Sequence, residues 1–125
     1  MTRILRVMKP NAQGEPASGS SATTLGVRVP RDIRDDSNQN VHPGTGGMSV
    51  SPRLADLPSF LVPRRLRTHC TGAAGNDNHH VWRLAQHAFT QGPIEAELYL
   101  RPDRPGHGVM EPCRVVPLTD YRAFL

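Results

Sequence analysis

Apolar and polar side chains alternate along several short stretches of the chain, and this period of two predicts short β-strands. The alternating stretches, each next to a proline or a glycine, are residues 3–9, 25–29, 48–51, 95–101 and 107–113. Residues 80–89 fit either a strand or a short helix, and their periodicity does not decide between the two. Thr119 is expected to cap a final helix that places Tyr121, Phe124 and Leu125 against the body. The pattern therefore predicts an α+β or mostly β domain.

Loops and turns are expected between these stretches. Residues 11–24 and 71–78 are rich in small and polar side chains, which predicts loops. Residues 31–40 contain three aspartates and two asparagines, whose side chains bond their own backbone in turns. Residues 52–63 hold three prolines among apolar residues, which indicates a short helical turn plus extended chain anchored to the core.

Residues 41–50 (VHPGTGGMSV) are the most informative segment. A proline and three glycines precede a strand pattern that places Ser49 and Ser51 on one face. Glycine is needed where the backbone adopts positive φ, or where a ligand or another segment approaches the main chain closely. The segment is thus either a ligand-binding elbow or a loop corner with a solvated serine face.

Length and composition limit the classes of protein. With 125 residues, of which 37% are hydrophobic, the chain is expected to form one domain over residues 1–125. It holds no apolar run of 18 residues, and its N-terminus lacks the apolar block of a secretory signal peptide, so we expect neither a membrane span nor a leader. Cys70 and Cys113 form no CxxC pair, which argues against a disulfide framework and a structural zinc site. We expect no bound metal.

The formal charge of +4 favours an anionic partner such as a nucleotide, a nucleic acid or an acidic protein. The fourteen arginines are scattered, however, with one tight group at Arg64, Arg65 and Arg67. Because aromatic residues make up 5% of the chain, few side chains are present for a base-stacking platform. Nucleic acid is therefore not the expected partner.

The order of several short motifs resembles a family of bacterial toxins, the type VI secretion effectors with an ADP-ribosyltransferase-like fold and their stand-alone relatives. The most distinctive motif is Gly-Gly-x-Ser-Val. The matching pieces are residues 4–7 (ILRV), 32–33 (DI), 43–50 (PGTGGMSV), 98–103 (LYLRPD) and 107–112 (HGVMEP).

The resemblance implies short strands in one or two small sheets, few helices, a C-terminal helix, and NAD as the substrate. It implies that Arg6 grips a phosphate of NAD, that Ser49 or its neighbour Ser51 supports the nicotinamide ribose, and that His107 lies in the same cleft. The remaining contacts that it implies with NAD are Thr45, Gly46, Gly47 and Met48. From the residues alone, Arg6 is equally well a solvated strand arginine, and a histidine after Pro-Gly is more often a turn residue.

Two positions depart from the family pattern. Met48 stands where the family toxin has threonine, and Gly108 stands where it has an aromatic residue. Glu95 and Glu97 match the Glu-x-Glu pattern with which many ADP-ribosyltransferases stabilise the ribose, but a polar strand face is the favoured interpretation.

The preferred function is therefore a toxin-like enzyme that binds NAD and either transfers ADP-ribose or cleaves NAD. It would act in the cytoplasm, delivered by a secretion system, with an immunity or antitoxin protein as partner. A second hypothesis is a metal-independent ribonuclease with His42 and His107 as acid and base. A third is a non-enzymatic interaction domain whose apolar strip, residues 54–62, meets a partner protein.

Overall fold

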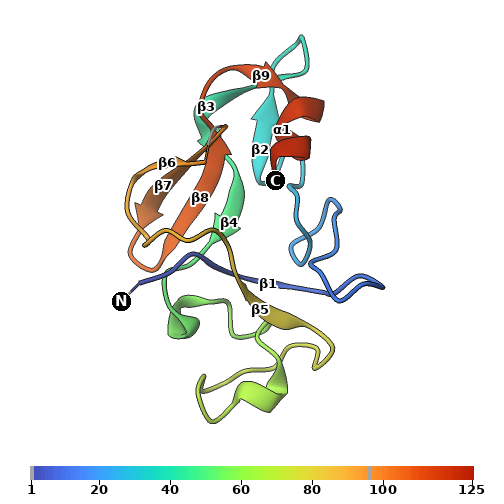
Figure 1. Cartoon of the computed structure of the whole chain (residues 1–125), viewed down its shortest axis with the longest axis vertical. Coiled ribbons are helices and arrows are strands. Elements are labelled where there is room, and N and C mark those ends of the chain that lie inside the picture. The colour runs from blue at the N-terminus through green and yellow to red at the C-terminus, as the bar shows by residue number, and fades with distance from the viewer. Residues whose placement is uncertain (1, 96) are drawn as a thin grey trace.

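The computed structural model describes residues 2–95 and 97–125. Nearly all regular structure in these residues is β-strand, followed by one short C-terminal helix (Figure 1). The elements are β1 (Leu5–Met8), β2 (Ile33–Asp35), β3 (Asn40–Gly46), β4 (Met48–Val50), the 3₁₀ turns η1 (Leu54–Asp56) and η2 (Arg64–Leu66), β5 (His80–Arg83), β6 (Gly92–Ile94), β7 (Leu98–Arg104), β8 (His107–Pro112), β9 (Val116–Pro117) and α1 (Leu118–Phe124).

The strands form three small antiparallel sheets, where one or two were expected. The largest has the order β4-β8-β7-β6, and the others are β2-β3-β9 and β1-β5. Figure 1 places β2, β3, β9 and α1 above the four-stranded sheet, with β1 and β5 below it. Small antiparallel sheets with one terminal helix are an α+β arrangement, as the sequence predicted.

The two upper sheets meet at Gly46 and Gly47, where β3 ends and β4 begins. Gly46 has a φ of 122°, and a Cβ there would lie 2.1 Å from the main-chain oxygen of Asp32. A Cβ on Gly47 would lie 2.4 Å from the main-chain oxygen of Met110. Both glycines are therefore required because other backbone segments approach them closely.

The core consists of two apolar clusters. The larger one joins Ile4, just before β1, to the two upper sheets and to Tyr121 of α1, and the side chains of Phe124 and Leu125 pack against it. The smaller one lies below and includes Val7, Leu57 and Val62. Because Ile4 and Val7 enter different clusters, the segment of residues 4–7 connects the two halves of the core.

Several predicted elements differ from the structure. Residues 25–29 form no strand, because their main chain bonds the preceding loop and Asp32 instead: the N–H of Leu25 donates to Ala17, and that of Arg28 donates to the Asp32 carboxylate. The helix begins at Leu118 after Pro117, so Thr119 lies inside it and is not its cap.

The predicted strand of residues 95–101 and the glycine segment also differ from the structure. The predicted strand 95–101 begins only at Leu98, and its Ala96 is outside the described residues. Residues 40–46 pair as a strand instead of forming a free elbow, because their main chain lies between β2 and β9.

None of the helices in the described parts of the chain has the length and apolar character needed to cross a membrane. Cys70 is buried and Cys113 is exposed, and both are free thiols.

The hydroxyl of Tyr121 fixes the helix to the junction of the sheets. It accepts a hydrogen bond from the N–H of Met48 at 3.1 Å and donates one to the oxygen of Met110 at 2.6 Å. Burial raises the pKa of Tyr121, so the hydroxyl remains a donor at any ordinary pH.

Replacement of Tyr121 by Phe leaves both buried main-chain groups without their partner. We expect the free energy of unfolding, measured by urea denaturation, to fall by about 1–3 kcal/mol. Tyr99→Phe is the matched control, because the Tyr99 hydroxyl bonds only the exposed Gln91 side chain, and its effect should stay within about 0.5 kcal/mol. Equal losses in the two variants would contradict this account.

Candidate ligand-binding cavity

A cavity of about 430 Å³ lies between the lower half of the molecule and the four-stranded sheet. This volume is within the range of small-molecule sites. Five separate segments form its wall: β1, the chain before β2, β4 with Ser51, the turn after η1, and the β7–β8 hairpin. The side chains of Arg6, Ser49, Ser51 and His107, expected from the sequence to share a site, all line it.

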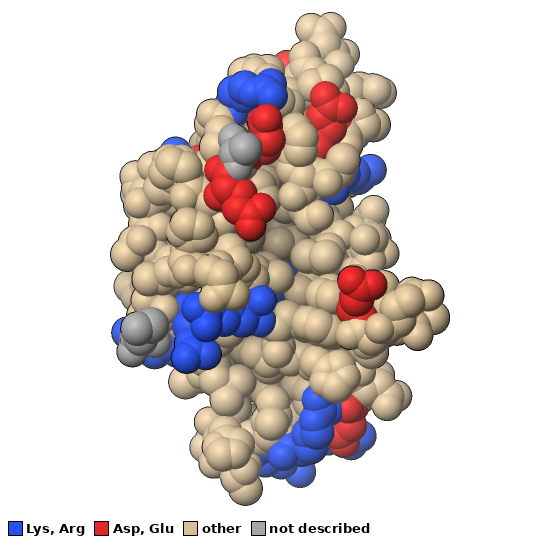
Figure 2. Space-filling model, viewed as in Figure 1, with Lys and Arg blue, Asp and Glu red and all other residues tan. Residues whose placement is uncertain are grey.

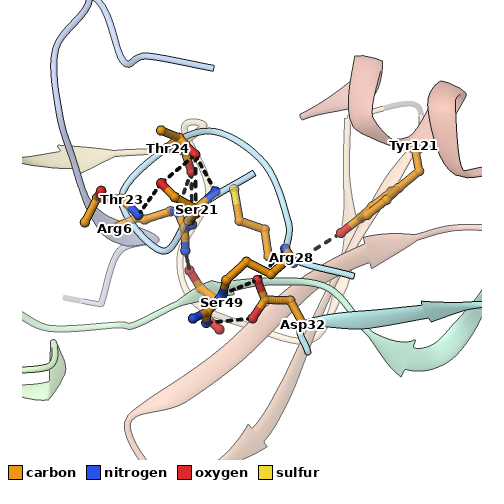
Figure 3. A network of polar contacts seen from close by, with 9 residues as sticks. Arg6, Ser21, Thr23, Thr24, Arg28, Asp32, Ser49 and Tyr121 are labelled. Carbon is orange, nitrogen blue, oxygen red and sulfur yellow. Dashed lines mark hydrogen bonds and ion pairs between the residues drawn. The ribbon is translucent and has the colours of Figure 1, made fainter. Parts of the chain in front are cut away.

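Arg6 is 5% exposed, and its guanidinium is bound by main-chain oxygens (Figure 3). Nε and Nη2 donate to the oxygen of Thr24 at 3.1 and 2.9 Å, Nη2 donates to Ser21 at 3.2 Å, and Nη1 donates to Ser49 at 2.8 Å. Four of its five N–H groups are thereby used.

A fork of two parallel hydrogen bonds to a phosphate needs a neighbouring pair of free N–H groups. Arg6 therefore serves as a brace that holds the loop of residues 21–24 against β4, and is not arranged as a solvated strand arginine or as a phosphate fork. Burial lowers its pKa to about 10, partly offset by the charge of Asp32, so the guanidinium stays charged at neutral pH.

Arg28 and Asp32 form an ion pair beside Arg6 (Figure 3). Nε and Nη2 of Arg28 donate to the two carboxylate oxygens at 3.0 and 2.9 Å, and the N–H of Arg28 adds a bond of 2.7 Å. Burial acts to raise the pKa of Asp32, but the hydrogen bonds from Arg28 outweigh it and hold the pKa below its ordinary value. The carboxylate thus orders the segment that carries Arg28 and Arg31 of this wall.

Two further arginines of the wall are free to meet a ligand. Arg31 has no ion pair within the described residues, and Arg104 has only a distant one, 3.8 Å from Asp103. An unpaired guanidinium keeps its two-pronged donor set for a phosphate or a carboxylate. The cavity is therefore suited to an anion, held by Arg31 and Arg104 and not by Arg6.

His107 begins β8 and is 18% exposed at its side chain. Its Nδ1 lies 2.6 Å from a carboxylate oxygen of Asp103, across the β7–β8 hairpin turn. This contact orients the ring and favours the tautomer with the proton on Nδ1, assigned here from the hydrogen bond. Nε2 is then left as an acceptor for the proton of a ligand or a water.

The two serines differ in their surroundings. Ser49 is half-buried, and its main-chain oxygen accepts the Arg6 bond, whereas Ser51 is 3% exposed and pairs through its backbone with Leu5. The alternative of a solvated serine face therefore does not hold for Ser51. Neither hydroxyl has a hydrogen-bond partner within residues 2–95 and 97–125, so both remain open to a ligand.

Thr45, Gly46, Gly47 and Met48 do not line this cavity. The Thr45 hydroxyl donates to the oxygen of His42, the two glycines form the junction between the sheets, and Met48 is a core side chain that borders a small apolar cavity elsewhere. The glycine segment is instead held by β8, because the N–H of Gly44 donates to the buried carboxylate of Glu111 at 2.7 Å.

Other predicted groups also lie apart from it. Glu95 borders the small apolar cavity, and Glu97 pairs with Arg114 at 3.0 Å. His42 lies on β3, the central strand of another sheet, and pairs with Asp36 at 2.8 Å. The cavity therefore contains neither the Glu-x-Glu pair nor a second histidine for a ribonuclease.

The structure explains the glycine at position 108 and the apolar strip of residues 54–62. A Cβ at Gly108 would lie 2.7 Å from the ring of Phe89, so Phe89 excludes the aromatic residue that the toxin family has at this position. Of the apolar strip 54–62, Leu57 and Val62 are buried, and Phe60 is its one large exposed residue at 69%. The strip is mainly part of the core.

Arg28, Arg31 and Arg104 line the cavity and Asp103 pairs with His107, and none of these roles was predicted from the sequence. Arg28 and Asp32 had a detectable signal, since their separation of four residues suits an ion pair across a tight turn. Asp103 and His107 have the same separation on either side of Pro-Gly, which predicts a hairpin that brings them together.

Charge elsewhere on the surface is dispersed. On the face shown in Figure 2, the lysine and arginine side chains form separate groups divided by uncharged surface. Within the described residues, no group of three or more His, Cys, Asp or Glu side chains is gathered as a metal site.

Comparison of the chain with protein-family models, with curated proteins and with solved structures finds no match.

Replacement of Arg6 by Ala tests the brace. It leaves the oxygens of Ser21, Thr24 and Ser49 without their donor, so we expect the free energy of unfolding to fall by about 2–4 kcal/mol. Arg31→Ala, which removes an exposed and unpaired arginine, should change it by less than about 0.5 kcal/mol. Chemical denaturation of the two variants decides, and an Arg6 variant as stable as wild type would restore the phosphate-gripping role.

Proposed function

We propose that this protein is a toxin-like enzyme that binds NAD in the cavity and cleaves it. The observation that carries the proposal is the convergence of Ser49, His107 and two exposed arginines, Arg31 and Arg104, on one cavity of about 430 Å³. The order of motifs that resembles the toxin family supports the choice of NAD among anionic ligands. An ADP-ribosyltransferase-like arrangement of the strands belongs to the same proposal.

In this proposal, arginines of the cavity wall bind the pyrophosphate group of NAD. Arg31 and Arg104 would bind its oxygens, because guanidinium groups pair with phosphate through charged hydrogen bonds. Arg28 would add charge while it remains paired with Asp32. The hydroxyls of Ser49 and Ser51 would then lie beside the sugar, where they can donate to or accept from ribose hydroxyls.

The His107–Asp103 pair favours cleavage by water over transfer to a protein. The bond between C1′ of the ribose and the nitrogen of nicotinamide breaks, and its electron pair leaves with nicotinamide. The oxygen of a water bonds to C1′, and the proton of that water passes to Nε2 of His107. Asp103 stabilises the resulting imidazolium through the 2.6 Å contact at Nδ1.

Transfer of ADP-ribose is the second form of the same proposal. It differs in that an acceptor side chain of a target protein takes the place of the water. The described lining of the cavity offers Asp32 as a carboxylate, and that group is bound by Arg28, so the glutamate used by many transferases has no counterpart in the wall. This is why hydrolysis is preferred.

His107→Ala removes the base and should lower the rate of nicotinamide release from NAD by at least about 100-fold. Asp103→Asn should lower it less, because the base is retained but is no longer held by a carboxylate. His42→Ala is the matched control, a histidine paired with an aspartate outside the cavity, and should keep wild-type activity. Wild-type turnover by folded His107→Ala protein would refute the mechanism.

The biological part of the proposal concerns toxicity in the cytoplasm and neutralisation by an immunity or antitoxin protein. Expression in bacteria without such a protein should arrest growth and deplete cellular NAD, whereas Ser49→Ala and His107→Ala should be tolerated. Loss of RNA with constant NAD would favour the ribonuclease hypothesis. Harmless accumulation of folded wild-type protein would favour the interaction domain.

A further inference from the structure

Phe60 lines the cavity although it contributes to neither core cluster. Its side chain is 69% exposed, whereas Leu57 and Val62 on the same segment are 6% and 0% exposed. Exposure of an aromatic ring to water is unfavourable, and a single exposed ring needs no explanation by itself. Here the ring also has a defined place on the wall of a cavity that carries cationic groups.

The segment that presents Phe60 is fixed by its own main chain. The N–H groups of Leu61 and Val62 donate to the oxygen of Pro58 at 2.9 and 3.2 Å, and the N–H of Ala74 donates to the oxygen of Ser59 at 2.9 Å. These bonds fix the backbone around Phe60, and the buried side chains of Leu57 and Val62 hold the turn against the smaller core cluster. The backbone that carries the ring is therefore ordered before any ligand binds, which lowers the cost in conformational entropy of binding a flat partner.

We propose that Phe60 stacks on an aromatic ring of the ligand, so that the cavity selects phosphorylated molecules that carry a base over phosphate compounds without one. Stacking supplies the contact with the base, while Arg31 and Arg104 on the same wall supply the contact with the phosphates. Pro58 and Leu61 border the ring and keep that part of the cavity apolar. This inference rests on the proposed function for the choice of NAD, but not for the requirement of a base.

The test compares affinities for NAD, ADP and inorganic pyrophosphate by calorimetric titration. Phe60→Ala should weaken binding of NAD and ADP by about tenfold or more, because stacking of one base contributes about 1–3 kcal/mol. It should leave the affinity for pyrophosphate unchanged within a factor of two. Phe60→Trp, which keeps a flat ring, should bind NAD and ADP with affinities close to those of wild type.

Val115→Ala is the matched control, since Val115 is the other large exposed apolar residue of the described chain, at 48%, and does not line the cavity. Because Phe60 lies outside the core, both alanine variants should unfold at the wild-type temperature, which excludes a loss of fold as the cause.

The outcomes separate the two proposals. If wild type binds ADP but not NAD, the choice of NAD is wrong, and the stacking role stands if Phe60→Ala loses ADP affinity. If wild type binds and cleaves NAD and Phe60→Ala equals it, the stacking role is wrong and the proposed function stands. If Phe60→Ala loses as much affinity for pyrophosphate as it does for ADP, the inference is overturned. It is also overturned if wild type binds neither NAD nor ADP.

Discussion

The positive charge of Arg6 is the constraint on which the rest of this structure depends. A guanidinium that is 5% exposed must have its N–H groups satisfied internally, and three main-chain oxygens from two distant segments do this. The same bonds place the loop of residues 21–24 against β4, and through β4 they fix the wall that carries Ser49. The loop has little regular structure of its own, and besides Arg6 it is held by the N–H of Lys9, which donates to the oxygen of Thr23 at 2.9 Å.

Around this brace, the arginines divide into structural and accessible groups. Arg6 gives four of its five N–H groups to the main chain, Arg28 is paired with Asp32, Arg31 has no ion pair within the described residues, and Arg104 has a distant one to Asp103. The inner arginine links segments of the main chain, while the exposed arginines supply positive charge. The wall of the cavity thus combines a buried, hydrogen-bonded arginine with two exposed ones, and it also carries His107 and Phe60.

Alternation of side chains predicted strands at β1, β4, β7 and β8, and the segment after Thr119 predicted the C-terminal helix. Burial alternates in β4 and in the first half of β7, whereas β1 buries Arg6, Val7 and Met8 in succession. Alternation failed for residues 25–29, where Leu25 and Val27 contact the core but the main chain bonds a loop, since alternation reports burial and not strand pairing. The resemblance predicted that Ser49 and His107 lie in one cleft, and both line the cavity. The role of Arg6 was not predicted, because a sequence cannot tell whether a strand arginine points toward ligand or toward carbonyl oxygens. Gly46 and Gly47 were recognised as sites of close approach, but the approaching group is backbone and not NAD.

The wall of the cavity comes from five segments that are far apart in the chain, and this couples ligand binding to stability. A molecule bound there contacts β1, β4, the Pro58–Leu61 turn and the β7–β8 hairpin at once, whereas the unfolded chain offers no such site. By mass action, a ligand at 100 times its dissociation constant adds about 2.7 kcal/mol to the free energy of unfolding. For a fold of three small sheets and one seven-residue helix, that is a substantial share of the total, so the protein's resistance to unfolding and to proteolysis would follow the concentration of its ligand.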